Sequence, residues 1–224
     1  MKKILLIIGL ISSLSLSFAE QNVIEVRSGY DVYNHVKDKD GDEDDDLFEN
    51  GWNLGLEYRR GIIGGLQLGA GIEISQSNSN APGDLYYPGG IAVKFDYDNL
   101  ISVPLYVTAR YNFENSTEVV PFVKLNLGYS FNSSKLQQDN YYDYTSKFQG
   151  ASYEVEDSFY YAFGAGIEYR NFLVDLTYEI NDFKINGKSY VSHDFMTGET
   201  EYRDDSYKFE NHKLKLSFGY QFEF

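Results

Sequence analysis

Apolar and polar residues alternate along nearly the whole chain beyond residue 19, and this pattern constrains the fold more than any other feature. In "KLKLSFGYQFEF", every second residue is apolar or aromatic, and the residues between are charged, polar or glycine. A period of two belongs to β-strands, whose side chains point alternately to opposite faces. The pattern predicts eight strands, at 24–36, 52–59, 66–74, 101–113, 119–131, 159–170, 172–180 and 213–224.

The connections between these segments alternate between tight and long. Tight links lie near 61–64, 114–118 and 170–172, and long ones near 37–50, 77–90, 132–157 and 182–206. This alternation is typical of membrane barrels, which have short turns on one side and long loops on the other. The prediction is therefore an all-β fold: an eight-stranded antiparallel transmembrane up-and-down β-barrel with short periplasmic turns and long extracellular loops. A soluble sandwich shares the period, but aromatic strand ends and charges on the opposite face favour the membrane.

The first 19 residues, "MKKILLIIGLISSLSLSFA", have two lysines, a short apolar run and small residues before a cleavage position. These features predict a secretory signal peptide at 1–19, followed by the barrel at 20–224. Export and the formal net charge of −15 argue against nucleic acid as a partner, because phosphates would be repelled. The chain has no cysteine and hence no disulfide or thiolate site.

Several segments carry a resemblance to a known family: "VPLYVTARYNF", "PFVKLNLGYSF", "FGAGIEYR" and "VDLTYEI". They resemble strands of the small eight-stranded outer-membrane barrels, the OmpA/OmpX-like and opacity-protein-like group. The resemblance implies a place in the cell outer membrane, among its lipids and lipopolysaccharide. It also implies recognition by the barrel-assembly machinery, through a C-terminal signal at Phe218, Tyr220, Phe222 and Phe224.

Charged residues occupy the face that would line the barrel interior. An eight-stranded barrel has an interior just wide enough for side chains, and unpaired charges there are costly. Seven basic and seven acidic residues fall on this face, so we expect a plugged lumen filled by ion pairs. The predicted set is Glu25, Arg27, Glu57, Arg59, Glu73, Arg110, Lys124, Glu168, Arg170, Asp175, Glu179, Lys213, Lys215 and Glu223.

The first long loop, "KDKDGDEDDDLFEN", is strongly acidic. Asp38, Asp40, Asp42 and Glu49 match positions 1, 3, 5 and 12 of a calcium loop, but Glu43 stands where the sharp turn needs glycine. The spacing indicates a weak calcium site, with a solvated acidic loop as the alternative. No other cofactor is expected.

The other long loops combine tyrosine with small polar residues, a composition typical of adaptable binding surfaces. They predict binding of an extracellular ligand or host surface, as in adhesion. A purely structural outer-membrane barrel and a narrow channel for small or hydrophobic solutes are the alternatives. No enzyme is expected, because no complete catalytic triad surrounds His35, His193 or His212. The candidate binding residues are Tyr86, Tyr87, Tyr141, Tyr142, Tyr144 and Tyr153.

Overall fold

The computed structural model describes residues 21–38, 47–81, 83–87, 91–142, 146–193, 197 and 199–224. The predicted signal peptide lies outside these residues. Thirteen strands make up the regular structure of the described chain. None of its described residues form a helix long and apolar enough to cross a membrane.

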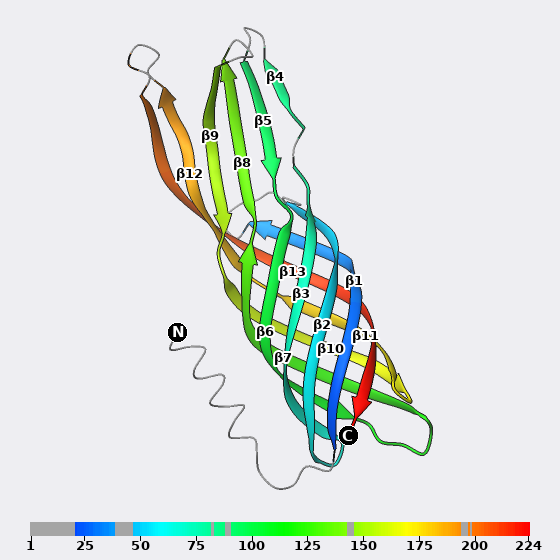
Figure 1. Ribbon diagram of the computed structural model, residues 1–224. Helices are drawn as coiled ribbons and strands as arrows, with labels where there is room; N and C mark the ends of the chain where they lie inside the picture. The colour runs from blue at the N-terminus through cyan, green and yellow to red at the C-terminus, as the bar shows by residue number, and fades with distance from the viewer. Residues whose placement is uncertain are drawn as a thin grey trace.

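Eight strands close into a ring, as the alternation predicted (Figure 1). Each is antiparallel to its neighbours, and β13 returns to pair with β1 from Val23↔Glu223 to Asp38↔Phe209. The ring therefore has no free edge. In order, its strands are β1 (Asn22–Asp38), β2 (Phe48–Ile63), β3 (Leu66–Ser79), β6 (Leu100–Asn112), β7 (Val119–Ser133), β10 (Ser158–Tyr169), β11 (Phe172–Ile180) and β13 (Thr200–Glu223).

Tight turns join strands at one end of the ring, which we call the turn end. Between β2 and β3, Gly64 and Gly65 have φ values of 53° and 79°, the left-handed region that favours glycine. A Cβ at Gly65 would also lie 2.3 Å from the carbonyl oxygen of Asn112. Glycine is thus required in this turn both by the backbone conformation and by the close approach of a neighbouring strand.

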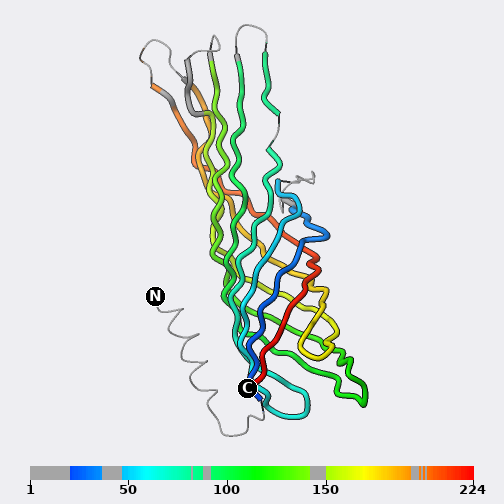
Figure 2. The backbone as a smooth tube through the Cα atoms, turned by 45° about the vertical axis from the view of Figure 1, so that its right-hand side comes forward, coloured from blue at the N-terminus to red at the C-terminus, as the bar shows by residue number. Residues whose placement is uncertain are grey.

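At the other end, three of the four predicted long loops contain strands of their own. These loops form β4 (Leu85–Tyr87), β8 (Lys135–Tyr142), β9 (Ser146–Val155) and β12 (Phe183–His193), while β5 (Ile91–Tyr97) lies between the second loop and β6. The sheet order continues from β13 through β12, β9, β8 and β5 to β4. These five strands and residues 200–208 of β13, here called the extension, rise from one side of the ring (Figures 1 and 2).

The ring is apolar outside and polar inside, the reverse of a soluble barrel. Leu56, Leu125 and Leu176 point outward and are each 46–50% exposed. Aromatic side chains gather near both ends of the strands, as in the interfacial girdles of membrane barrels. At the turn end these are Tyr58, Tyr111, Phe113, Tyr169, Phe172, Tyr220, Phe222 and Phe224, and near the extension Tyr30, Trp52, Phe131, Phe159 and Tyr161.

One strand departs from the predicted phase. The alternation placed Val36 on the outer face with Val32, but Val36 is fully buried inside. A β-bulge between Asp31 and Tyr33 shifts the register against β13, so that inner and outer positions exchange beyond it. His35 consequently lies opposite His212 rather than in the interior.

Candidate functional site: the barrel interior and its mouth

Arg27 lies at the centre of the charged interior. Its guanidinium donates a 2.5 Å hydrogen bond to the Tyr106 hydroxyl and contacts Glu57 and Glu73 at 3.3 Å each and Glu25 at 3.5 Å. A Cβ on Gly55, which pairs with Arg27, would lie 3.2 Å from its Nε atom. Small inward residues therefore make the room that the large charged side chains occupy.

Two further arginines extend this cluster toward the turn end. Arg59 contacts Glu25 at 2.6 Å, pairs with Glu57, and donates to the Gln67 side chain at 2.9 Å. Arg110 pairs with Glu168, and its guanidinium carbon lies 3.6 Å from the centroid of the Phe122 ring. Both guanidinium groups are thus held by carboxylates, with amide or aromatic contacts on their remaining faces.

Three lysines complete the charged interior: Lys124 on β7, and Lys213 and Lys215 on β13. Lys215 contacts Glu73 and Glu179 at 2.5 Å each. Lys124 lies 2.8 Å from Asp175. Lys213 hydrogen-bonds the Ser77 hydroxyl at 2.7 Å and lies 3.7 Å from Asp31. Each basic group of the interior therefore has at least one acidic partner.

Twelve of the fourteen predicted lumen charges lie inside, and two do not. Arg170 occupies the two-residue turn between β10 and β11 with a φ of 58°, so its side chain leaves the alternation. It is 65% exposed and pairs with Glu118 at 3.3 Å. Glu223 is exposed because it lies at the rim of the turn end, where it accepts a hydrogen bond from Gln221.

Asp31, which is not among the predicted lumen charges, is fully buried beside Lys213. Its inward phase was visible in the alternation, but it was not counted among the charges at membrane depth. Six basic and seven acidic side chains now make up the interior set, here called the ion network. Its members are Glu25, Arg27, Asp31, Glu57, Arg59, Glu73, Arg110, Lys124, Glu168, Asp175, Glu179, Lys213 and Lys215.

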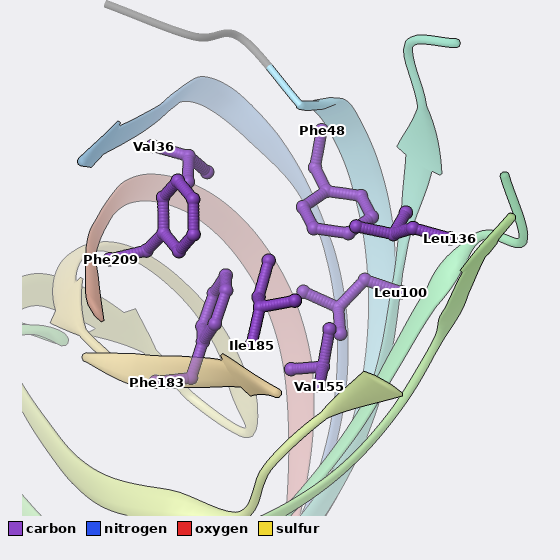
Figure 3. Close-up of a cluster of buried hydrophobic side chains, with 8 residues drawn as sticks. All are labelled: Val36, Phe48, Leu100, Leu136, Val155, Phe183, Ile185 and Phe209. Carbon is purple, nitrogen blue, oxygen red and sulfur yellow. The ribbon is translucent and has the colours of Figure 1, made fainter. Parts of the chain in front are cut away.

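An apolar cluster fills the mouth of the ring where the extension begins (Figure 3). Phe183 lies between Phe48 and Phe209, with ring centroids 6.3 and 5.9 Å away. Each member is 7% exposed or less. We call this cluster the apolar cap; its residues are Val36, Phe48, Leu100, Leu136, Val155, Phe183, Ile185 and Phe209.

The apolar cap draws on seven strands, and the alternation in the sequence does not predict it. Five of its residues belong to segments predicted to be long loops: Phe48, Leu136, Val155, Phe183 and Ile185. A buried aromatic or aliphatic side chain contributes roughly 1.5–3 kcal/mol. Two layers of different chemistry therefore lie inside the ring, the ion network below and the apolar cap at the mouth.

The remaining predicted residues lie on the outer surfaces. The residues of the predicted assembly signal face outward: Phe218, Tyr220, Phe222 and Phe224 are 59%, 37%, 54% and 68% exposed. In the predicted calcium loop, Glu49 is exposed at the start of β2. The Asp38 side chain, Asp40 and Asp42 lie outside the described residues.

The candidate tyrosines are spread over the extension. Tyr86 and Tyr87 are 63% and 49% exposed on β4, its last strand. Tyr141 on β8 and Tyr153 on β9 are half-buried. The Tyr142 side chain and Tyr144 lie outside the described residues. The extension thus presents tyrosines from separate strands of one sheet.

Comparison with protein families gives one match over nearly the whole chain. Residues 4–222 match the model of the outer membrane protein beta-barrel domain. A curated relative, uncharacterized protein PM1543 of Pasteurella multocida (strain Pm70), is 30% identical over 131 residues. That match covers 54% of this chain and 50% of the relative, so the chain spans about half of the relative's length.

Solved structures with similar folds are distant in sequence. Neisserial surface protein A is 14% identical, with a TM-score of 0.44 over 90% of this chain and 97% of its own. Ail, the attachment invasion locus protein of Yersinia pestis, is 16% identical, with a TM-score of 0.41 over 92% and 100%. OprG from Pseudomonas aeruginosa is 12% identical, with a TM-score of 0.47 over 92% and 97%.

Proposed function

The chain belongs to the outer membrane protein beta-barrel domain family, and from that premise we propose that it is a plugged barrel whose extension binds surfaces outside the cell. As a member of this family it is an integral β-barrel protein of the outer membrane. The proposed mechanism is adhesion, in which a fixed barrel carries a binding sheet and no reaction is turned over.

The observation that carries this proposal is the extension itself. β13 is 24 residues long, and its first part pairs with β12 while the remainder closes the barrel. One continuous strand thus joins the membrane domain to the external sheet. A hydrogen-bonded sheet loses less conformational entropy on binding than free loops would, which favours affinity.

The outward face of the extension has the chemistry of a polar binding surface. A hollow of about 650 Å³ lies over β9, β12 and β13, where Asn186, Lys188, Tyr202 and Asp204 line it. Amide, hydroxyl and aromatic groups of this kind form adaptable contacts at low entropic cost. We infer that this hollow contacts the external surface.

Asp205, at the edge of the same hollow, is expected to stay charged in mildly acidic surroundings. Its carboxylate accepts hydrogen bonds from the Ser189 hydroxyl and from Arg203, whose Nε lies 2.9 Å away. These hydrogen bonds lower the pKa of Asp205. The acidic character of the extension should therefore persist as the external pH falls.

Two features support a plugged, non-catalytic barrel. The ion network and the apolar cap both fill the space through which a solute would pass. His212, near the outer rim, has its Nδ1 atom 2.5 Å from the Tyr178 hydroxyl oxygen, so its ring is held by a tyrosine. We therefore propose neither transport nor hydrolysis.

Exchange of the extension tests the binding proposal. We expect adhesion of protein-coated beads to epithelial monolayers to move with the extension when it is grafted onto an unrelated eight-stranded barrel. Tyr202→Ala combined with Lys188→Glu should reduce bead retention about tenfold, because both residues line the outward hollow. Arg170→Ala, in the turn-end loop, is the control and should retain full adhesion. Equal adhesion of grafted and ungrafted barrels would leave a purely structural role.

The depth of the membrane-embedded surface can be tested with two arginine substitutions. Leu125 lies in the middle of β7 and is 47% exposed, and Val191 lies on β12 in the extension and is 50% exposed. Leu125→Arg should lower the unfolding free energy by about 2–4 kcal/mol, because the charge enters hydrocarbon. Val191→Arg should change it by about 0.5 kcal/mol or less. Urea unfolding in lipid vesicles measures both, and similar losses would contradict the proposed membrane boundary.

A further inference from the structure

A small pocket lies on the inward face of the extension, directly above the apolar cap. Its volume is about 220 Å³. Leu136, Ile185 and Phe209 of the apolar cap form its aliphatic and aromatic floor. Tyr97, Tyr153 and Tyr207 line it from three different strands. We call it the mouth pocket.

Strand register builds the mouth pocket from neighbouring positions. Leu136 pairs with Tyr97 on one side and with Tyr153 on the other. Ile185 pairs with Tyr207. A Cβ on Gly187 would lie 2.6 Å from the Tyr153 ring, so this glycine lets the ring lie across β12. Tyr153 and Tyr207 consequently meet edge to face, with centroids 6.0 Å apart.

The wall and floor of the mouth pocket differ in chemistry. Leu136, Ile185 and Phe209 are 5%, 2% and 6% exposed, so the floor is apolar and well packed. The tyrosines bring phenol hydroxyls that both donate and accept hydrogen bonds. Burial, followed by the proximity of Tyr207 and Asp205, raises the pKa of the Tyr153 phenol, so it remains a neutral donor. An apolar floor with neutral polar groups above it suits an uncharged ring with one polar substituent.

We propose that the mouth pocket binds one small uncharged aromatic molecule of the size of a phenol or an indole. An enclosed apolar cavity of roughly 150 Å³ accommodates benzene, and the mouth pocket, which is open on one side, has a volume of about 220 Å³, enough for a substituted ring. Anionic aromatics are disfavoured by the formal net charge of −15. The cap beneath keeps the molecule at the mouth, so this site goes beyond the proposed surface binding.

Fluorine NMR on the full chain refolded in lipid nanodiscs tests the site, with 4-fluorophenol, fluorobenzene and 4-fluorobenzoate as probes. We expect saturable binding of 4-fluorophenol and at least tenfold weaker binding of 4-fluorobenzoate. Tyr207→Phe should weaken 4-fluorophenol about five- to tenfold and leave fluorobenzene unchanged, because it removes one hydroxyl. Tyr202→Phe is the matched control. It lies on the same strand at similar exposure, 38% against 39%, but lines the outward hollow.

A second variant, Ile185→Phe, fills the floor and should abolish saturable binding of both neutral probes. A folded barrel shows a heat-dependent gel shift, and only variants with this shift are compared. If Ile185→Phe does not fold, Tyr207→Phe alone tests the site. If the probes show the same fluorine NMR changes in protein-free nanodiscs, they partition only into lipid, and the proposal is overturned. Unchanged 4-fluorophenol binding in Tyr207→Phe, or equal binding of the benzoate, would overturn it as well.

Discussion

Arg27→Ala should lower the free energy of unfolding of the barrel by about 3–5 kcal/mol, the cost of breaking a buried ion pair by removing one partner. The side chain is 3% exposed and contacts three carboxylates and the Tyr106 hydroxyl. Its loss leaves Glu57 and Glu73 in the interior with less positive charge around them. The loss of unfolding free energy therefore comes mainly from the buried carboxylates that remain.

Urea unfolding of the refolded barrel in lipid vesicles measures this loss, and the chain contains a matched control. Arg170 also pairs with a glutamate, Glu118, but the two side chains are 65% and 63% exposed. Arg170→Ala should change the unfolding free energy by about 1 kcal/mol or less. Comparable losses in the two variants would mean that the ion network does not stabilise the barrel.

The eight ring strands could be predicted from the sequence because each has one lipid-facing and one interior face. In β7, for example, Val123, Leu125 and Leu127 point outward while Lys124 and Asn126 are buried. The lipid outside and the polar interior impose a period of two, which can be seen in the sequence without knowing which strands pair. The ring, its direction of alternation and its tight turns all followed from that one signal.

Apart from β5, over which the alternation of 101–113 continues back to Ile91, the extension gives no such signal, since its strands carry polar residues on both faces. β8, with the sequence "KLQQDNYY", reads as a loop by composition, yet it pairs with β5 and β9. Its strand structure depends on long-range pairing that begins where β13 continues beyond the ring. The bulge after Asp31 is likewise a property of the pairing between β1 and β13. It moved Val36 into the apolar cap.

The sequence shows which charged residues belong to the candidate site, but not which of them contact each other. Alternation identifies the charges that point inward, and it placed Arg27 and Glu73 there correctly. Their contact joins β1 to β3 across β2, which depends on side-chain length and on space over Gly55. For Arg170 the alternation wrongly predicts an inward side chain, because a turn residue in the left-handed region does not follow the strand period. Pairing and turn geometry therefore require the three-dimensional structure.

Phe183→Ala should lower the unfolding free energy by about 3–5 kcal/mol and still leave the barrel closed to ions. The ring is 2% exposed and packs between Phe48 and Phe209, so its removal leaves a cavity in the apolar cap. The ion network below is untouched and continues to fill the lumen. Tyr202→Ala, on the outward face of the extension, should cost roughly 0.5 kcal/mol or less.

Unfolding in vesicles gives the stability, and single-channel recording in planar bilayers gives the conductance. The wild-type barrel and Phe183→Ala should both be silent, whereas combining Phe183→Ala with Arg27→Ala weakens both layers and should produce openings in the folded fraction. Openings in Phe183→Ala alone would make the apolar cap the only seal. Steady openings in the wild type, altered by Arg27→Ala, would replace the plugged barrel with a narrow channel, because the ion network would then line a conducting path.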